Sequence, residues 1–151
     1  MRFDFFRRRV RVRVSGILIR DGALLLIAHR KKDRVYWLLP GGGVKFGESL
    51  ERALRREFRE ELGIDVDVHD LVLACDSIEP GGRRHIVNLS FRCTYREGEY
   101  ALGAERRLHG YGFFGRDEIP GKKIYPPMQD AIITILDNKT AGVYLGSLWT
   151  D

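Results

Sequence analysis

The sequence has few of the features that mark zinc-binding, membrane-spanning or secreted proteins. It contains only two cysteines, Cys75 and Cys93. They are far apart and lack the close CxxC or histidine spacing of a zinc site, so we expect reduced thiols. No stretch approaches the roughly 20 apolar residues of a membrane span, and no apolar segment follows the N-terminal charges as in a signal peptide. We therefore expect a cytoplasmic protein.

The length and composition indicate one domain. The chain has 151 residues, of which 44% are hydrophobic, enough for one core and too few for two domains. We find no internal repeat, low-complexity tract or long linker. We expect a single domain over residues 1–151, with a basic arm at 1–9 and a tail at 139–151.

The net charge of +5 comes from the N-terminus. Residues 1–13 contain six of the 26 basic residues and one of the 21 acidic ones, so 20 of each remain in the body. The arginines are those at positions 2, 7, 8, 9, 11 and 13. Such an arm can be a solvated strand edge, because charged edges deter aggregation. It can also contact phosphates, which leaves RNA open as a partner.

The first half of the chain has the pattern of strands. Valines alternate with arginines over 10–14, and strands over 16–20 and 23–29 flank Asp21-Gly22, a strong two-residue hairpin turn. A short strand over 35–39 should stop at the glycine-rich segment 40–43, where we expect no regular element. Further strands are expected over three later segments: 66–75, 85–95 and 111–114.

Two segments have helical spacing. Ser49 is a good N-cap, apolar residues recur at helical intervals after it, and Gly63 supplies the stop. A second helix is expected over 127–138. Strands flanking two helices predict an α/β fold, with a mixed sheet between helices. The last dozen residues are too short to assign.

The first helix carries an unfavourable group of acids. Glu57, Glu60 and Glu61 share one face near its C-terminal end, where like charges repel and the helix dipole disfavours carboxylates. Interleaved arginines offer one compensation, through the i,i+4 pairs Glu51–Arg55 and Arg56–Glu60. A divalent cation offers another, because Mg²⁺ binds a few carboxylates and leaves room for water and phosphates. The glycine-rich segment can approach such a site closely.

The stretch Gly42–Ile64 resembles the Nudix box, G-x5-E-x7-R-E-U-x-E-E-x-G-U, at every position, with Phe58 and Ile64 at the bulky apolar U positions. The resemblance also covers segments outside the box, from about residue 10 to 138. These are 37–42, Phe113-Phe114, 117–120 and the late helix. It implies the Nudix α/β/α sandwich and hydrolysis of a nucleoside diphosphate linked to some other group X.

The resemblance also implies roles for the box residues. Metal ligands for Mg²⁺ or Mn²⁺ would be the following: Glu57, Glu60, Glu61, the carbonyl of Gly41, and Glu48 directly or through water. Arg56 would orient the carboxylates. The general base stays open. Candidates are a box acid such as Glu57 or a later acid: Glu97, Glu99, Glu105, Asp117 or Glu118.

Candidate substrate contacts lie outside the box, and each has a competing interpretation. Arg30 can hold a phosphate or be a solvated arginine. Tyr36 and Trp37 can stack on a base, although Trp37 beside apolar neighbours also suits the core. Arg83, Arg84 and His85 lie in a glycine-rich turn and can reach phosphate.

As substrate, we expect a (d)NTP or small nucleotide derivative first, and ADP-ribose or a nucleotide sugar second. Pro80 lies near the position where ADP-ribose-cleaving members carry a proline, but turns use proline anyway. A non-catalytic nucleotide- or RNA-binding module is the alternative of another class. The complete set of box acids favours catalysis. The sequence leaves the oligomeric state open, a homodimer included.

RNA binding through the arm has a direct test. If Arg7, Arg8 and Arg9 contact RNA phosphates, binding to 5′-triphosphorylated RNA should weaken steeply with salt, because each contact releases counterions. Replacing all three with alanine should reduce the slope of log affinity against log salt by about two for a single-stranded RNA. An unchanged slope in filter-binding or fluorescence titrations would leave the arm without this role.

Overall fold

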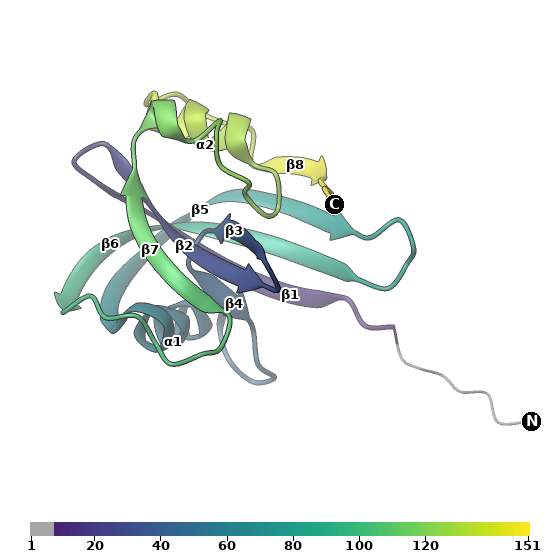
Figure 1. Ribbon diagram of the computed structural model, residues 1–151, viewed down its shortest axis with the longest axis horizontal. Coiled ribbons are helices and arrows are strands. Elements are labelled where there is room, and N and C mark those ends of the chain that lie inside the picture. The colour runs from purple at the N-terminus through teal and green to yellow at the C-terminus, as the bar shows by residue number, and fades with distance from the viewer. Residues whose placement is uncertain (1–7) are drawn as a thin grey trace, which may run out of the picture.

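The protein forms one mixed sheet between two helices, in a computed structural model that describes residues 8–151 (Figure 1). Part of the expected basic arm, including Arg2 and Arg7, lies outside the described residues. The strand order is β3-β2-β1-β6-β5-β8, with β4 paired to β1 and β7 paired to β2. The elements in chain order are β1 Arg11–Arg20, β2 Ala23–Lys31, β3 Arg34–Leu38, β4 Gly41–Gly43, α1 Leu50–Leu62, β5 Ile64–Ile78, β6 His85–Gly98, β7 Leu108–Phe114, the 3₁₀ turn η1 Arg116–Glu118, α2 Gln129–Leu136 and β8 Tyr144–Ser147.

Strand β1 connects the two halves of the sheet. It pairs antiparallel with β2 and β4 and parallel with β6. The expected hairpin between β1 and β2 is confirmed: Asp21 and Gly22 both have positive φ, 51° and 77°, as a tight two-residue turn requires. The parallel pairs β1–β6 and β5–β8 make the sheet mixed, as expected.

Helix α1 covers one face of the sheet (Figure 1). Its expected limits are confirmed, because the Ser49 side chain accepts a hydrogen bond from the Arg52 backbone N–H and Gly63 ends the helix with φ 69°. The Phe58 ring is fully buried against β1. A Cβ atom at Gly16 would lie 2.5 Å from that ring, so only glycine lets the helix pack this closely to β1.

Helix α2 covers the opposite face over a second core. It is shorter than expected, starting at Gln129 instead of residue 127. The unassigned C-terminal tail contains β8, which extends the sheet beside β5. The Tyr144 hydroxyl donates to the Asp76 carboxylate there. In the described part of the chain, neither helix is long and apolar enough to cross a membrane.

Two expectations were wrong. The glycine-rich segment does contain a regular element, because Gly41–Gly43 forms β4 against Arg13–Ser15 of β1. The pair Glu51–Arg55 was also expected, but Arg55 instead donates two hydrogen bonds, of 3.0 and 2.8 Å, to Asp65 beyond the end of the helix. A bidentate contact to a partly buried carboxylate is stronger than an exposed i,i+4 pair.

Asp65 joins the end of α1 to two strands. Besides Arg55, it has Arg59 and Arg96 within 3.8 Å, and the hydrogen bonds from Arg55 lower the pKa of Asp65. A carboxyl group whose pKa is lowered on folding stabilises the fold above its unfolded pKa, and loses that contribution as pH falls through the folded value.

We therefore expect Asp65→Asn to lower the melting temperature near neutral pH by about 2–4 °C, and to have little effect in strong acid, where Asp65 is already protonated. Calorimetry at both pH values tests this. Asp67→Asn is the matched control, because Asp67 is an exposed acid on the same strand with no ion pair among the described residues. An equal loss at both pH values would contradict the role of the charge.

Candidate functional site

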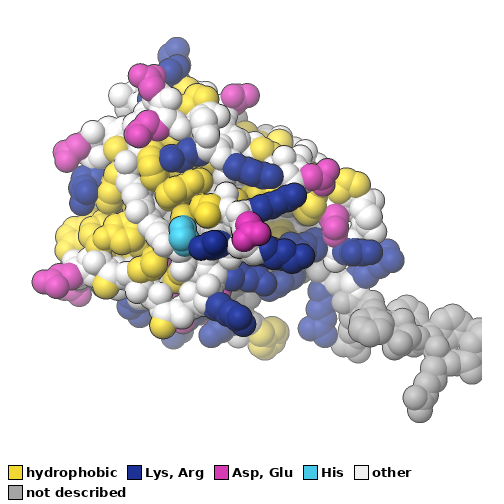
Figure 2. All heavy atoms as spheres, in the orientation of Figure 1, with side chains coloured by type: hydrophobic (Ala, Val, Ile, Leu, Met, Phe, Trp, Pro, Cys, Tyr) yellow, Lys and Arg dark blue, Asp and Glu magenta, His cyan; other side chains and the backbone are white. Residues whose placement is uncertain are grey.

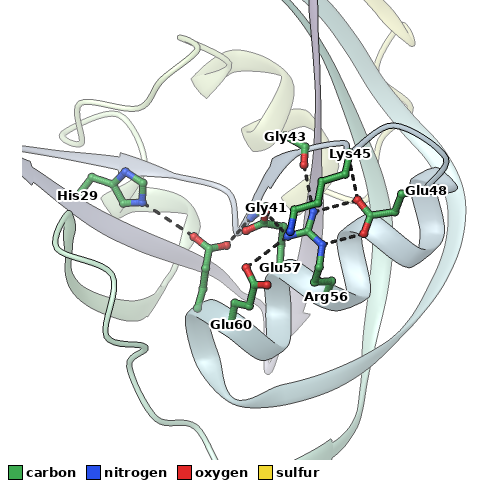
Figure 3. A network of polar contacts seen from close by, with 9 residues as sticks. His29, Gly41, Gly43, Lys45, Glu48, Arg56, Glu57 and Glu60 are labelled. Atoms are coloured by element: carbon green, nitrogen blue, oxygen red, sulfur yellow. Dashed lines mark hydrogen bonds and ion pairs between the residues drawn. The ribbon is translucent and has the colours of Figure 1, made fainter.

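Arg56 lies at the centre of a group of acids (Figure 3). Its guanidinium donates to Glu48 at 2.7 and 2.9 Å, to Glu57 at 2.8 Å and to Glu60 at 3.3 Å. It also donates to the Gly43 carbonyl at 3.1 Å. The hydrogen bond from Arg56 lowers the pKa of Glu48 to about 2. One cation thus holds three carboxylates together and ties helix α1 to strand β4.

Glu61 is the buried acid of the group. Only 2% of its surface is exposed, and burial raises the pKa of its carboxyl group. Its Oε1 accepts a 2.8 Å hydrogen bond from the Gly41 backbone N–H, and its Oε2 lies 3.9 Å from Nε2 of His29. The backbone of strand β4 therefore contacts the group at both ends, Gly41 at Glu61 and Gly43 at Arg56.

Between these two contacts, Gly42 lies directly against Glu57. A Cβ atom at Gly42 would be 2.4 Å from the Glu57 carboxylate, so the carboxylate occupies the space that any other residue would fill. A Cβ atom at Gly43 would meet nothing within 4 Å. The glycine requirement at position 42 is thus specific to the acid, since the backbone there is not in the left-handed region.

The donor atoms suit a divalent cation in kind. Carboxylate and carbonyl oxygens are the ligands that Mg²⁺ and Mn²⁺ prefer, and the expected ligands Gly41, Glu48, Glu57, Glu60 and Glu61 lie around one strand and one helix face. Within residues 8–151, no three acidic, histidine or cysteine side chains are grouped closely enough to hold an ion. Glu57 and Glu60 point to Arg56 instead. Ion binding therefore requires these carboxylates to turn from the guanidinium.

The three expected substrate contacts lie in different places. Tyr36 packs edge-on against His29, at a ring distance of 5.7 Å, and Nε2 of His29 in turn lies 3.9 Å from Glu61. Trp37, its neighbour on β3, packs against Phe114 in the core below α2. Arg30 is exposed, and its Nε donates to the Lys32 carbonyl. Side chains alternate between the two faces of a strand, which explains why these residues lie apart. Tyr36 pairs with His29, whereas Trp37 and Arg30, the next residues on their strands, point to the other face.

Sequence reasoning missed two residues beside the acids, Arg13 and His29. Arg13 was counted with the basic arm, but it lies in β1, where its Nη2 donates to the Leu39 carbonyl at 3.0 Å. The neighbouring carboxylates of Glu61 and Glu57 interact with its charge. His29 could have been found from period-two alternation, since it continues the buried row of Leu25 and Ile27.

The structure separates the acids that were considered for general base. Asp117 lies within 3.4 Å of Arg116, and Glu118 accepts a hydrogen bond from the Gly115 backbone N–H. Both belong to η1, near α2. Glu105 lies in the segment after β6 that contacts the acidic helix, where the Gly103 N–H donates to the Glu61 carbonyl at 2.9 Å. The phosphate candidates Arg83, Arg84 and His85 lie at the β5–β6 turn, and His85 faces Asp76.

Basic side chains are plentiful on one face of the molecule. In the space-filling view, Lys and Arg spread across the middle of the face shown, whereas Asp and Glu are scattered (Figure 2). A basic surface of this kind attracts phosphorylated compounds. Fold and site together define an α/β domain in which a glycine strand and an acidic helix form one site suited to a cation and phosphate.

The chain belongs to the Nudix family, because the family model described as NUDIX domain matches residues 8–134. Members of this family generally use divalent metal ions. The expected resemblance and the expected α/β/α architecture are therefore confirmed.

Curated relatives match parts of the chain. A "MutT-like protein" of Streptomyces ambofaciens is 41% identical over 83 residues, 54% of this chain and 50% of its own length. An "ADP-ribose pyrophosphatase" of Methanocaldococcus jannaschii is 32% identical over 97 residues, 64% of this chain and 57% of its own. A "Nucleoside triphosphatase NudI" of Escherichia coli is 48% identical over 58 residues, 36% of this chain and 41% of its own. The matches thus span about half of each relative.

Solved structures match more fully. A MutT NUDIX hydrolase from Burkholderia pseudomallei is 30% identical, with a TM-score of 0.72, over 83% of this chain and 96% of that one. The common architecture therefore includes nearly the whole of that protein.

The contact between Gly42 and Glu57 has a matched test. We expect Gly42→Ala to displace the Glu57 carboxylate and weaken Mn²⁺ binding by about tenfold or more, measured by electron paramagnetic resonance of free Mn²⁺. Gly43→Ala is the control, since the added methyl group meets nothing and the carbonyl that Arg56 uses remains. Equal Mn²⁺ affinity in the two variants would show that the space beside Gly42 is not needed for ion binding.

Proposed function

We propose that the chain is a divalent-metal-dependent pyrophosphohydrolase, which uses water to cleave the diphosphate linkage of a nucleoside diphosphate joined to a further group. One observation carries the proposal: the five charged residues that the Nudix box specifies gather around strand β4. They are Glu48, Arg56, Glu57, Glu60 and Glu61. This arrangement is costly for folding alone, because it holds like charges together and buries one of them.

In this proposal the box residues have different roles. Glu57, Glu60 and Glu61, with the Gly41 carbonyl and Glu48 in support, would hold Mg²⁺ or Mn²⁺. The bound ion supplies charge neutralisation of phosphate oxygens and a lower pKa for the attacking water. Arg56 orients the acids, since it contacts Glu48, Glu57 and Glu60 at once. Water attacks phosphorus as a general base takes its proton, a P–O bond of the anhydride breaks, and the departing phosphate takes the electron pair.

The favoured substrate is a (d)NTP or small nucleotide derivative. The Escherichia coli nucleoside triphosphatase supports this class, since its 48% identity is the highest among the relatives described above. The position of Tyr36 supports a nucleotide substrate, because its ring packs against His29, and Nε2 of His29 lies 3.9 Å from Glu61. The Tyr36 ring also packs edge-on against Tyr125, at a centroid distance of 5.1 Å. Aromatic rings of this kind can stack on a base.

ADP-ribose is the second candidate. The archaeal ADP-ribose pyrophosphatase shares 32% identity over a longer stretch, 97 residues, and that observation favours it. Pro80 adds no support from its position. It is exposed at the β5–β6 turn, next to the backbone hydrogen bond from Glu79 to Arg84.

One experiment tests reaction and substrate together. The full chain is incubated with NTPs, dNTPs, ADP-ribose, nucleotide sugars, dinucleotides and 5′-triphosphorylated RNA, with Mg²⁺, with Mn²⁺ and with EDTA. We expect metal-dependent release of a nucleoside monophosphate and pyrophosphate from at least one triphosphate. Release from ADP-ribose alone would select the second candidate. Silence across the panel, with metal binding shown separately, would overturn hydrolysis in favour of a nucleotide-binding module.

The acids themselves give the matching variants. We expect Glu60→Gln and Glu61→Gln each to cut turnover about a hundredfold or more, while the melting temperature stays near that of the parent or rises, because each removes repulsion between neighbouring carboxylates. Glutamine at position 61 still offers an oxygen to the Gly41 N–H. Glu51→Gln is the control, an exposed acid on the first turn of the same helix. Full activity in both test variants would refute the metal assignment.

A further inference from the structure

Arg13 has donor groups to spare beside the acids. It lies on β1 between Gly43 of β4 and Asn88 of β6, and burial lowers the pKa of its guanidinium while Glu61 and Glu57 act to raise it. A guanidinium carries five N–H donors. Within residues 8–151, the structure gives this one a single hydrogen bond, to the Leu39 carbonyl at 3.0 Å.

His29 has a buried nitrogen that needs a partner. Its Nε2 is shielded from solvent and has no hydrogen bond among the described residues, because Oε2 of Glu61 is 3.9 Å away, beyond hydrogen-bonding distance. Its ring is held edge-on to Tyr36. A buried polar atom without a partner costs free energy, so such an atom in a native fold calls for a specific explanation.

These two residues approach the acids from the strands, whereas Arg56 approaches them from helix α1. Nε2 of His29 lies 3.9 Å from Glu61. Arg13 donates to the carbonyl of Leu39, two residues before Gly41, whose N–H binds the same Glu61 carboxylate. Arg56 makes five hydrogen bonds, to the acids and Gly43. Among the described residues, Arg13 and His29 add donors from the strands that these bonds do not use.

We propose that Arg13 and His29 form a phosphate-binding subsite that holds the oxygens of the diphosphate group not attacked by water. An arginine fork matches two phosphate oxygens, and an Nε2–H of His29 can donate to a third. This subsite deepens the proposed function and rests on it. Its ligand chemistry is that of a diphosphate, so inorganic pyrophosphate is a direct probe.

The competing role for both residues is to neutralise Glu61 and nothing more. The two roles differ in what the substitutions change. A neutralising residue governs the binding of cations at the acids, whereas a phosphate-binding residue governs the binding of the anion. Turnover alone would fall in either case, so binding must be measured without it.

The experiment is calorimetric titration of the full chain with inorganic pyrophosphate in EDTA, beside Mn²⁺ binding by paramagnetic resonance. Arg13→Met keeps the aliphatic stem, and His29→Phe keeps the ring that packs on Tyr36. We expect Arg13→Met to weaken pyrophosphate binding by about tenfold or more and His29→Phe by a smaller factor, with Mn²⁺ affinity unchanged. Arg13→Lys should recover part of the loss, and it also serves if Arg13→Met fails to fold.

Arg20→Met is the matched control, because Arg20 lies on the same strand with its guanidinium 3.8 Å from the Phe113 ring centroid, among aromatic side chains. It should bind pyrophosphate like the parent. Parental pyrophosphate affinity in folded Arg13→Met and His29→Phe would overturn the subsite. A chain that hydrolyses nothing, yet loses pyrophosphate binding in these variants, would refute the proposed hydrolysis and leave the subsite in place.

Discussion

The site depends on one electrostatic constraint: several carboxylates share one helix face, and cations must hold them there. Two unit charges a few ångströms apart interact by several kcal/mol at the dielectric of a protein surface, and the helix dipole adds to the cost at the C-terminal half. Arg56 meets this constraint by contacting three acids and a backbone carbonyl together. Because Arg56 reaches Gly43, the same interaction also sets where β4 lies against α1.

Strand β1 provides the geometry that this electrostatic group needs. Its backbone pairs with β4, which brings Gly41 and Gly42 to Glu61 and Glu57. Its Gly16 admits the Phe58 ring of α1, and its Arg13 donates to the Leu39 carbonyl just before the glycine segment. One strand therefore places the glycine segment, seats the acidic helix and contributes a charge. The two cores on either side of the sheet keep it in that position.

Local signals explain which parts of the fold and site were predictable. The Asp21-Gly22 turn, the Ser49 cap and the Gly63 stop act on adjacent residues, and so does the helical spacing of Glu57, Glu60 and Glu61. The misses involve partners distant in sequence. Three glycines have no side-chain pattern, so β4 becomes a strand only because β1 lies beside it. Arg55 donates its hydrogen bonds to Asp65, which lies beyond the end of the helix. Arg13 follows other arginines in sequence, as in a solvated arm, and only its pairing with Gly43 and Asn88 places it inside the sheet.

The pairing of Arg13 with Gly43 on one side and Asn88 on the other has a thermodynamic consequence. Residues around the acids come from β1, β2, β4 and α1, so they stay together only while these elements remain packed on one another. A ligand of the group is therefore linked to the equilibrium between the packed and the opened form of these elements. Its binding free energy adds to the stability of the central strands, and amide exchange should slow there as well as at the loops that it touches.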